Sequence, residues 1–170
     1  AEAERKAAEE AAKAKAEAER KAAEEADKAK AEAQPKEAEE ETFRMLNIYK
    51  KLCEEYLAIP VLSGKKTEKE KFAGAEYTLT LESLMQNGVS LQSATSHYFG
   101  DKFSKAYDVK FLGRENKLEY PYQTSWGMTT RIIGALIMVH SDDRGLVLPP
   151  KIAPTQVSII NIGKDEEVND

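Results

Sequence analysis

A short segment, Gln123–Gly134, holds the residues of this chain best suited to an anionic ligand. Side chains alternate along a strand, so Ser125, Gly127 and Thr129 share one face if the segment is extended. Arg131 follows on that face, where an apolar helix begins. A glycine lets a ligand approach the backbone, and a guanidinium meets phosphate oxygens in a fixed fork. The face therefore suits a phosphate-bearing ligand, although the spacing alone also fits an ordinary amphipathic strand ending in a surface arginine.

A second extended segment, 89–100, ends in polar residues where a core strand would end in apolar ones. Thr95 and His97 share one face of a regular strand, whereas Gln92 points to the other face. A β-bulge near Ser93 and Ala94 is therefore needed if all three side chains contact one ligand. The alternative for His97 is a hydrogen-bonded histidine at the end of a strand.

Together these two segments resemble prolyl-tRNA synthetase, in the archaeal and eukaryotic-like form of that class II enzyme. Four further segments of the chain resemble the same family, at 37–42 (EAEEET), 56–60 (YLAIP), 67–75 (TEKEKFAGA) and 142–150 (DDRGLVLPP). The resemblance covers the chain from about residue 37 to residue 170. In combination these motifs are highly specific.

The resemblance implies a role for each candidate residue. Arg131 looks like the arginine of class II motif 3, which binds the ATP phosphates and stabilises the charge that develops during adenylate formation. The implied ATP-binding residues are Gln92, Thr95, Thr129 and Arg131, and the implied proline-binding residues are His97, Ser125, Trp126 and Gly127. The family uses ATP with Mg²⁺, proline and the proline tRNA, and none of these is expected to stay tightly bound.

The resemblance also implies what the chain lacks. The family's motif 1, motif 2 and proline-gripping loops should all precede residue 37. We therefore expect a fragment of a proline–tRNA ligase that is inactive alone, or that works with a second chain supplying motifs 1 and 2. The alternative is a non-catalytic spacer or interaction protein built on a synthetase-like fold.

Composition excludes several other classes of protein. The chain has 170 residues, enough for one domain, and a net charge of −5 with no basic stripe, so DNA is not an expected partner. The single cysteine, Cys53, cannot form an internal disulfide, which suits a reducing cytoplasm. The longest apolar run, 132–139, is too short to span a membrane.

The N-terminus is a repeat of helix-forming residues. The eleven residues at 1–11 recur unchanged at 16–26, and the first 42 residues contain no large apolar side chain. Alanine, glutamate and lysine favour helix, so we expect a lone, solvated helix over 1–34. Pro35 either ends this helix, opens the next one, or kinks a continuous helix.

The predicted fold class is α+β: a partial class II synthetase antiparallel sheet with helices, preceded by the long helix. The chain divides into three expected regions, at 1–35 (helix or spacer), 36–150 (the motif 3 half of a catalytic domain) and 151–170 (a linker and the first strand of an anticodon-binding domain). The expected elements are a helix over 36–57, an extended segment over 59–63, a hairpin over 76–98, a short helix over 103–107, a second hairpin over 109–125, a helix over 132–140 and a strand over 156–162. Gly134 and Ala135 should let the last helix approach the sheet, with Met128 and Met138 in the core.

Overall fold

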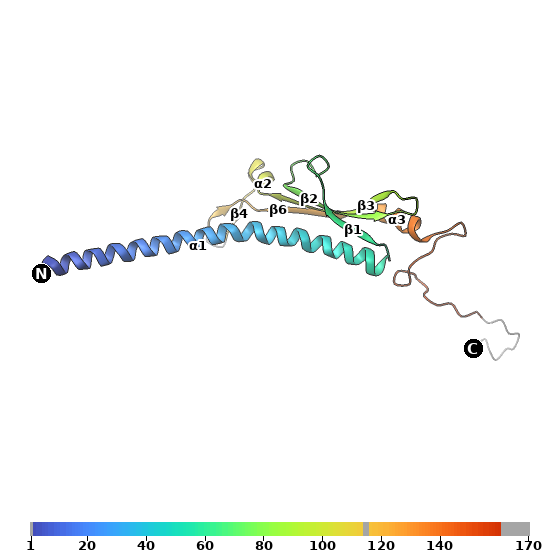
Figure 1. The fold of residues 1–170 in the computed structure, drawn as a ribbon, viewed down its shortest axis with the longest axis horizontal. Coiled ribbons are helices and arrows are strands. Elements are labelled where there is room, and N and C mark those ends of the chain that lie inside the picture. Colours follow the sequence, from blue (N-terminus) through green and yellow to red (C-terminus); the bar gives the residue numbers. More distant parts are fainter. Residues whose placement is uncertain (1, 114–115, 161–170) are drawn as a thin grey trace.

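The computed structural model describes residues 2–113 and 116–160, and it confirms the α+β class. Four antiparallel strands form a sheet in the order β1-β2-β3-β6, and α1 runs along one side of it (Figure 1). The elements are α1 (Glu2–Lys51), a π-helical turn η1 (Leu52–Tyr56), β1 (Val61–Lys65), β2 (Tyr77–Leu84), β3 (Ser90–Gly100), α2 (Lys102–Ala106), β4 (Phe111–Leu112), β5 (Leu118–Glu119), β6 (Gln123–Met128) and α3 (Arg131–His140).

The helix α1 continues through Pro35 without a break. A proline in a helix interior costs about 3 kcal/mol relative to alanine, because its missing N–H removes a hydrogen bond. Strong helix formers precede it, and the turns after it are held against the sheet: Thr42 and Leu46 are buried, and Ser96 Oγ donates to the Thr42 carbonyl oxygen at 2.8 Å. Of the three possibilities for this proline, continuation is the one observed, so α1 crosses the region boundary expected at 35/36.

The N-terminal half of α1 is unlike its C-terminal half. Side chains at 14–22 are exposed, and Glu17 and Lys21 form an i, i+4 ion pair at 3.0 Å. Figure 1 shows this half of the helix extending beyond the sheet. Further along the helix, the Gln34 side chain donates a hydrogen bond to Glu119 of β5. The expectation of a solvated helix is met over 14–22, and Gln34 contacts the rest of the chain.

The hairpin of β2 and β3 is the centre of the fold and was predicted. Leu81 pairs with Ala94 whereas Glu82 pairs with Gln92, so Ser93 is an extra residue on β3. This is a β-bulge, and it lies at the place where the sequence needed one for Gln92, Thr95 and His97 to contact a common ligand. Beyond the bulge the ladder is regular.

The second predicted hairpin is only partly correct. Its strands β4 and β5 pair over two residues each, and Gly113 begins the turn, of which residues 114 and 115 lie outside the described part. The strand expected over 118–125 is interrupted at 120–122, where Pro121 has no N–H to donate to a ladder. After this interruption the chain enters β6, which pairs with β3 and completes the main sheet.

The core lies between the sheet and the helices on its α1 side. Its buried members include Leu79, Leu81 and Ala94 from the sheet, with Ala135 and Leu136 from α3. Cys53 is fully buried among them and burial raises the pKa of its thiol to about 11, as fits a small packing residue.

Two core assignments were wrong. Gly134 is exposed with no atom within 4 Å of a Cβ built there, so the close approach is made by Ala135 alone. Met138 is 44% exposed, because it lies on the outer face of α3, while Met128 is half-buried against the core as expected.

The strand expected over 156–162 is not formed at 156–160, and 161–162 lie outside the described residues. Val157 and Ile159 are exposed there, since no strand of the described chain pairs with this segment. Within the described ranges, none of the helices is both long and apolar enough to cross a membrane.

Candidate functional site

The bulge at Ser93 brings the three polar candidates of β3 to one face of the sheet. Because Ser93 is inserted between Gln92 and Ala94, Gln92 changes face and joins Thr95 and His97. The helix-covered face takes the alternate residues instead, among them Ala94 and Ser96. The condition that the sequence set for a common ligand is therefore met.

Strand β6 contributes two further candidates to this face. Gly127 pairs with Thr95, and Ser125 pairs with His97, so both project to the same side as their partners. Both are exposed, and no atom lies within 4 Å of a Cβ built on Gly127. The backbone of β6 is therefore open to approach at this glycine.

Trp126 does not join them. It pairs with Ser96, whose hydroxyl bonds to α1, so by alternation Trp126 lies on the helix side of the sheet with 44% of its surface exposed. The structure thus separates Trp126 from the other three residues expected to bind proline. Three consecutive residues of one strand cannot all face the same side, because side chains alternate with a period of two residues.

Strand β2 adds three polar residues to the face that the sequence analysis did not single out. Thr78 pairs with His97, Thr80 with Thr95, and Glu82 with Gln92. The signal was present, since these residues alternate with Leu79 and Leu81 in one strand.

His97 is held by the loop before β2 as well as by the sheet. Its Nδ1 lies 2.9 Å from Thr78 Oγ1, and its ring lies 5.1 Å from the Phe72 ring, centroid to centroid. Burial, and secondarily the positive charge of Lys66, lower the pKa of His97 below its ordinary value. The imidazole is therefore biased toward its neutral form near pH 7.

Arg131 marks the other end of the face. It is the first residue of α3, its backbone N–H donates to Thr129 Oγ1 at 3.3 Å, and its Nη1 lies 3.5 Å from the Gln92 carbonyl oxygen. Arg131 is exposed. Lys66 donates to Gln92 Oε1. Two cations and a helix N-terminus thus gather around Gln92, a setting that favours an anion.

The carboxylate on this face belongs to Glu82. Its oxygens accept hydrogen bonds from Thr80 at 2.8 Å and Ser90 at 3.2 Å. Across the described residues, no group of three or more histidine, cysteine, aspartate or glutamate side chains is arranged to hold a metal ion. One carboxylate suits Mg²⁺ that arrives with phosphate oxygens and water as its other ligands.

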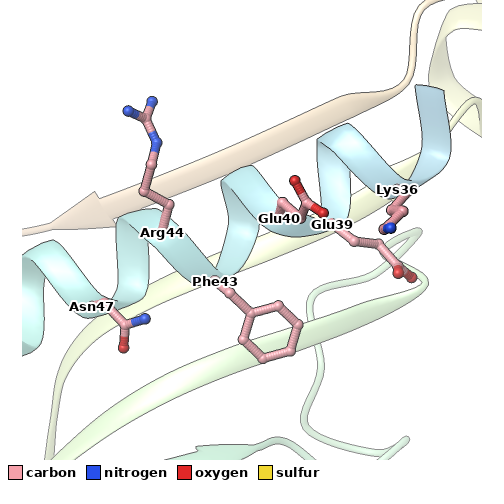
Figure 2. Close-up of a pocket in the computed structure, with 6 residues that line it drawn as sticks. All are labelled: Lys36, Glu39, Glu40, Phe43, Arg44 and Asn47. Carbon is pink, nitrogen blue, oxygen red and sulfur yellow. The ribbon is translucent and has the colours of Figure 1, made fainter. Parts of the chain in front are cut away.

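A shallow hollow of about 530 Å³ lies elsewhere, along α1 on the other side of the sheet. Figure 2 shows its six lining side chains on that helix: Lys36, Glu39, Glu40, Phe43, Arg44 and Asn47. The hollow carries both acidic and basic groups, and Glu41 already holds the Arg44 guanidinium at 2.7 and 2.8 Å. Since all six come from one helix face and none converges on a common point, the sheet face is the stronger candidate.

Comparison with known proteins gives one consistent result. No family model matches the chain. Proline–tRNA ligase from Lachnoclostridium phytofermentans is 63% identical over 126 residues, which are 74% of this chain and 26% of that protein. Proline–tRNA ligase 2 from Bacillus cereus is 61% identical over 127 residues, 75% of this chain and 27% of that protein. The chain thus spans about a quarter of the length of the curated relatives it matches.

A solved structure agrees with these sequences. Prolyl-tRNA synthetase from Cryptosporidium parvum, complexed with L-proline and AMP, matches with a TM-score of 0.67 and 48% identity. The match covers 72% of this chain and 26% of that one.

Proposed function

Because about three quarters of this chain corresponds to one segment of the prolyl-tRNA synthetases, we propose that its open sheet face is part of a site that activates proline with ATP. The supporting observation is the bulge at Ser93, which gathers Gln92, Thr95 and His97 beside Ser125 and Gly127. In a regular strand, the Gln92 side chain would point toward α1, on the opposite face from Thr95 and His97.

ATP occupies the end of the face near Arg131. The guanidinium, the Lys66 ammonium and the N-terminus of α3 stabilise phosphate charge, and Gln92 and Thr95 offer hydrogen-bonding groups beside them. The Thr129 hydroxyl accepts a hydrogen bond from the backbone N–H of Arg131, and in this way Thr129 contributes to the site. Mg²⁺, when bound, neutralises phosphate charge, and Glu82 is the carboxylate on this face that would hold it.

Proline occupies the end near His97. The Phe72 ring supplies an apolar surface beside the imidazole, and Ser125 and Gly127 border the same space from β6. The relative from Cryptosporidium parvum is complexed with L-proline and AMP, so an amino acid and a nucleotide side by side fit this arrangement. Transfer to the proline tRNA follows in the complete enzyme, in the cytoplasm, where the buried thiol of Cys53 stays reduced.

The chain does not activate proline by itself. Adenylate formation needs cations on both sides of the triphosphate, and in the described chain Lys66 and Arg131 are the cations joined to Gln92. A second chain that supplies motifs 1 and 2 completes the clamp.

Proline-dependent exchange of pyrophosphate into ATP tests this proposal. The purified chain should show only background exchange, and adding the part of a relative that carries motifs 1 and 2 should raise it. Exchange well above background by the chain alone, lost in Arg131→Ala, would contradict inactivity. No gain with the added part, although the two bind each other, would contradict the proposed site.

A second candidate is a non-catalytic spacer or interaction protein. The exposed helical segment over 14–22 favours it, because this segment is ordered without contact to the sheet. Equal ATP affinity in the wild type and in Arg131→Ala would favour this candidate over the synthetase site.

A further inference from the structure

Thr78 pairs with His97 across the β2–β3 ladder and has only 1% of its surface exposed. Two groups reach its hydroxyl oxygen. The backbone N–H of Phe72 donates to Thr78 Oγ1 at 3.1 Å, and His97 Nδ1 lies 2.9 Å from the same oxygen. The hydroxyl therefore links the loop before β2 to the imidazole.

The direction of the second hydrogen bond follows from burial. The Phe72 N–H can only donate, so it uses one lone pair of Thr78 Oγ1. The Thr78 hydroxyl proton then needs an acceptor, and in the described chain His97 Nδ1 is the acceptor within reach. A proton on Nδ1 would leave a buried hydroxyl without an acceptor, which is unfavourable.

We propose that Thr78 is a positioning residue that holds His97 in the neutral tautomer with its proton on Nε2. The Nε2–H makes no hydrogen bond to the described residues, and the ring it belongs to borders Phe72 and Phe99, at 5.1 and 5.9 Å between centroids. His97 thus presents a hydrogen-bond donor to an oxygen atom of its ligand. Only the identity of that ligand rests on the proposed function.

The bias of His97 toward the neutral form supports the assignment. Burial and the charge of Lys66 both lower the pKa of His97, so the imidazole carries a single proton at neutral pH. A single proton can sit on only one nitrogen, and the partner of the other nitrogen selects it. Thr78 is the partner that the structure provides.

The test uses ¹⁵N-labelled histidine in the full chain, where long-range ¹H–¹⁵N spectra report which ring nitrogen carries the proton. The chain has two histidines, His97 and His140. His140 is an internal control because its Nε2 lies 2.7 Å from the Leu57 carbonyl oxygen, so its tautomer does not depend on Thr78. In the wild type at neutral pH, the His97 spectrum should show one neutral tautomer with an Nε2–H. An Nδ1–H tautomer overturns the inference, without any variant being needed.

Two variants separate positioning from packing. Thr78→Val keeps the shape but removes the hydroxyl, and should convert the single tautomer into a mixture or into the Nδ1–H form. Thr78→Ser keeps the hydroxyl and should preserve the wild-type signature, with His140 unchanged in both. A Val variant that folds and keeps the pure Nε2–H tautomer overturns the role of Thr78.

Proline added to the wild-type chain then tests the two proposals separately. A shift of the His97 Nε2–H resonance on proline addition supports both. If the tautomer is as expected but proline moves no His97 resonance, the proposed function loses its proline pocket and the role of Thr78 stands.

Discussion

The two faces of the sheet are built from the same strands but have different roles. On the helix side, Leu79, Leu81 and Ala94 pack against α1 and α3 and are at most 5% exposed. On the open side, Thr78, Thr80 and Glu82 alternate with those leucines in β2, and hydrogen bonds join them to one another and to β3. One face supplies the burial that stabilises the fold, and the other carries the charged and polar groups.

The bulge at Ser93 keeps the Gln92 side chain on the open face of the sheet, away from the apolar residues on the helix side. Without it, β3 would place Gln92 among the apolar residues and an apolar residue beside Lys66. The buried hydroxyls of Ser83 and Ser93 lie within hydrogen-bonding distance of each other, so the inserted residue leaves no unsatisfied side chain in the core. Stability and binding can therefore be changed separately, by substituting a buried leucine on the helix side or the exposed Arg131 on the open side.

The largest expected effect is on the helix-covered face. Leu81→Ala removes a side chain that is fully buried, and should lower the free energy of unfolding by about 2–5 kcal/mol. Urea unfolding measures the change. Leu84→Ala, in the same strand but at a residue 68% exposed, is the matched control and should change it by less than about 0.5 kcal/mol. Equal losses for the two variants would contradict the assigned faces.

On the open face, Arg131→Ala should reduce binding and leave stability unchanged. One arginine and a few hydrogen bonds supply only about 4 kcal/mol, so ATP affinity should be millimolar at best, and losing the guanidinium should weaken it about tenfold or more. Chemical shifts of the labelled chain during ATP titration measure both.

Arg44→Ala, on the helix that covers the other face, is the control for charge and should not alter ATP affinity. The proposed ATP site is contradicted if ATP shifts the resonances of other residues but not those of Gln92, Thr95, Thr129 and Arg131.

A smaller effect on the free energy of unfolding should appear as pH falls. The pKa of His97 is lowered in the folded chain, so below its ordinary value of 6.5 the unfolded chain takes up a proton that the folded chain refuses. Stability should therefore decline as pH falls from about 6.5 through the folded pKa. Urea midpoints of the wild type and His97→Gln at several pH values measure this, and the variant should lack that part of the decline. A wild type that gains stability over this range relative to the variant would show that the pKa is raised instead.

The smallest effect should come from deleting residues 1–33. The segment contains no large apolar side chain, and the contact with Glu119 belongs to Gln34, which the deletion keeps. The unfolding free energy should change by less than about 0.5 kcal/mol. A marked loss would mean that this part of α1 is a packed element of the fold.

The corresponding peptide should be helical at low temperature and lose helicity gradually on heating, because exposed ion pairs are individually weak. Circular dichroism of the peptide, the truncated chain and the whole chain tests this. A largely unfolded peptide at low temperature would contradict an autonomous helix.

Local pattern was sufficient for several features. Alanine, glutamate and lysine predicted the helix before Pro35, and the hairpin predicted over 76–98 is formed by β2 and β3. Parity also gave the place of the bulge, but only on the condition, implied by the family resemblance, that Gln92, Thr95 and His97 contact one ligand. These features depend on residues close together in the chain, where propensity and a fixed period decide the geometry.

Only the tertiary structure decided the others. Continuation of α1 through Pro35 depends on packing of the next turns against Ser96, and β6 leaves its predicted partner for β3 because Pro121 interrupts the strand. The side taken by Trp126 and the Thr78–His97 contact both follow from pairing between strands distant in sequence. A sequence specifies which residues alternate, but which side faces the core is settled when another element buries one of them, since burial on one face drives the choice.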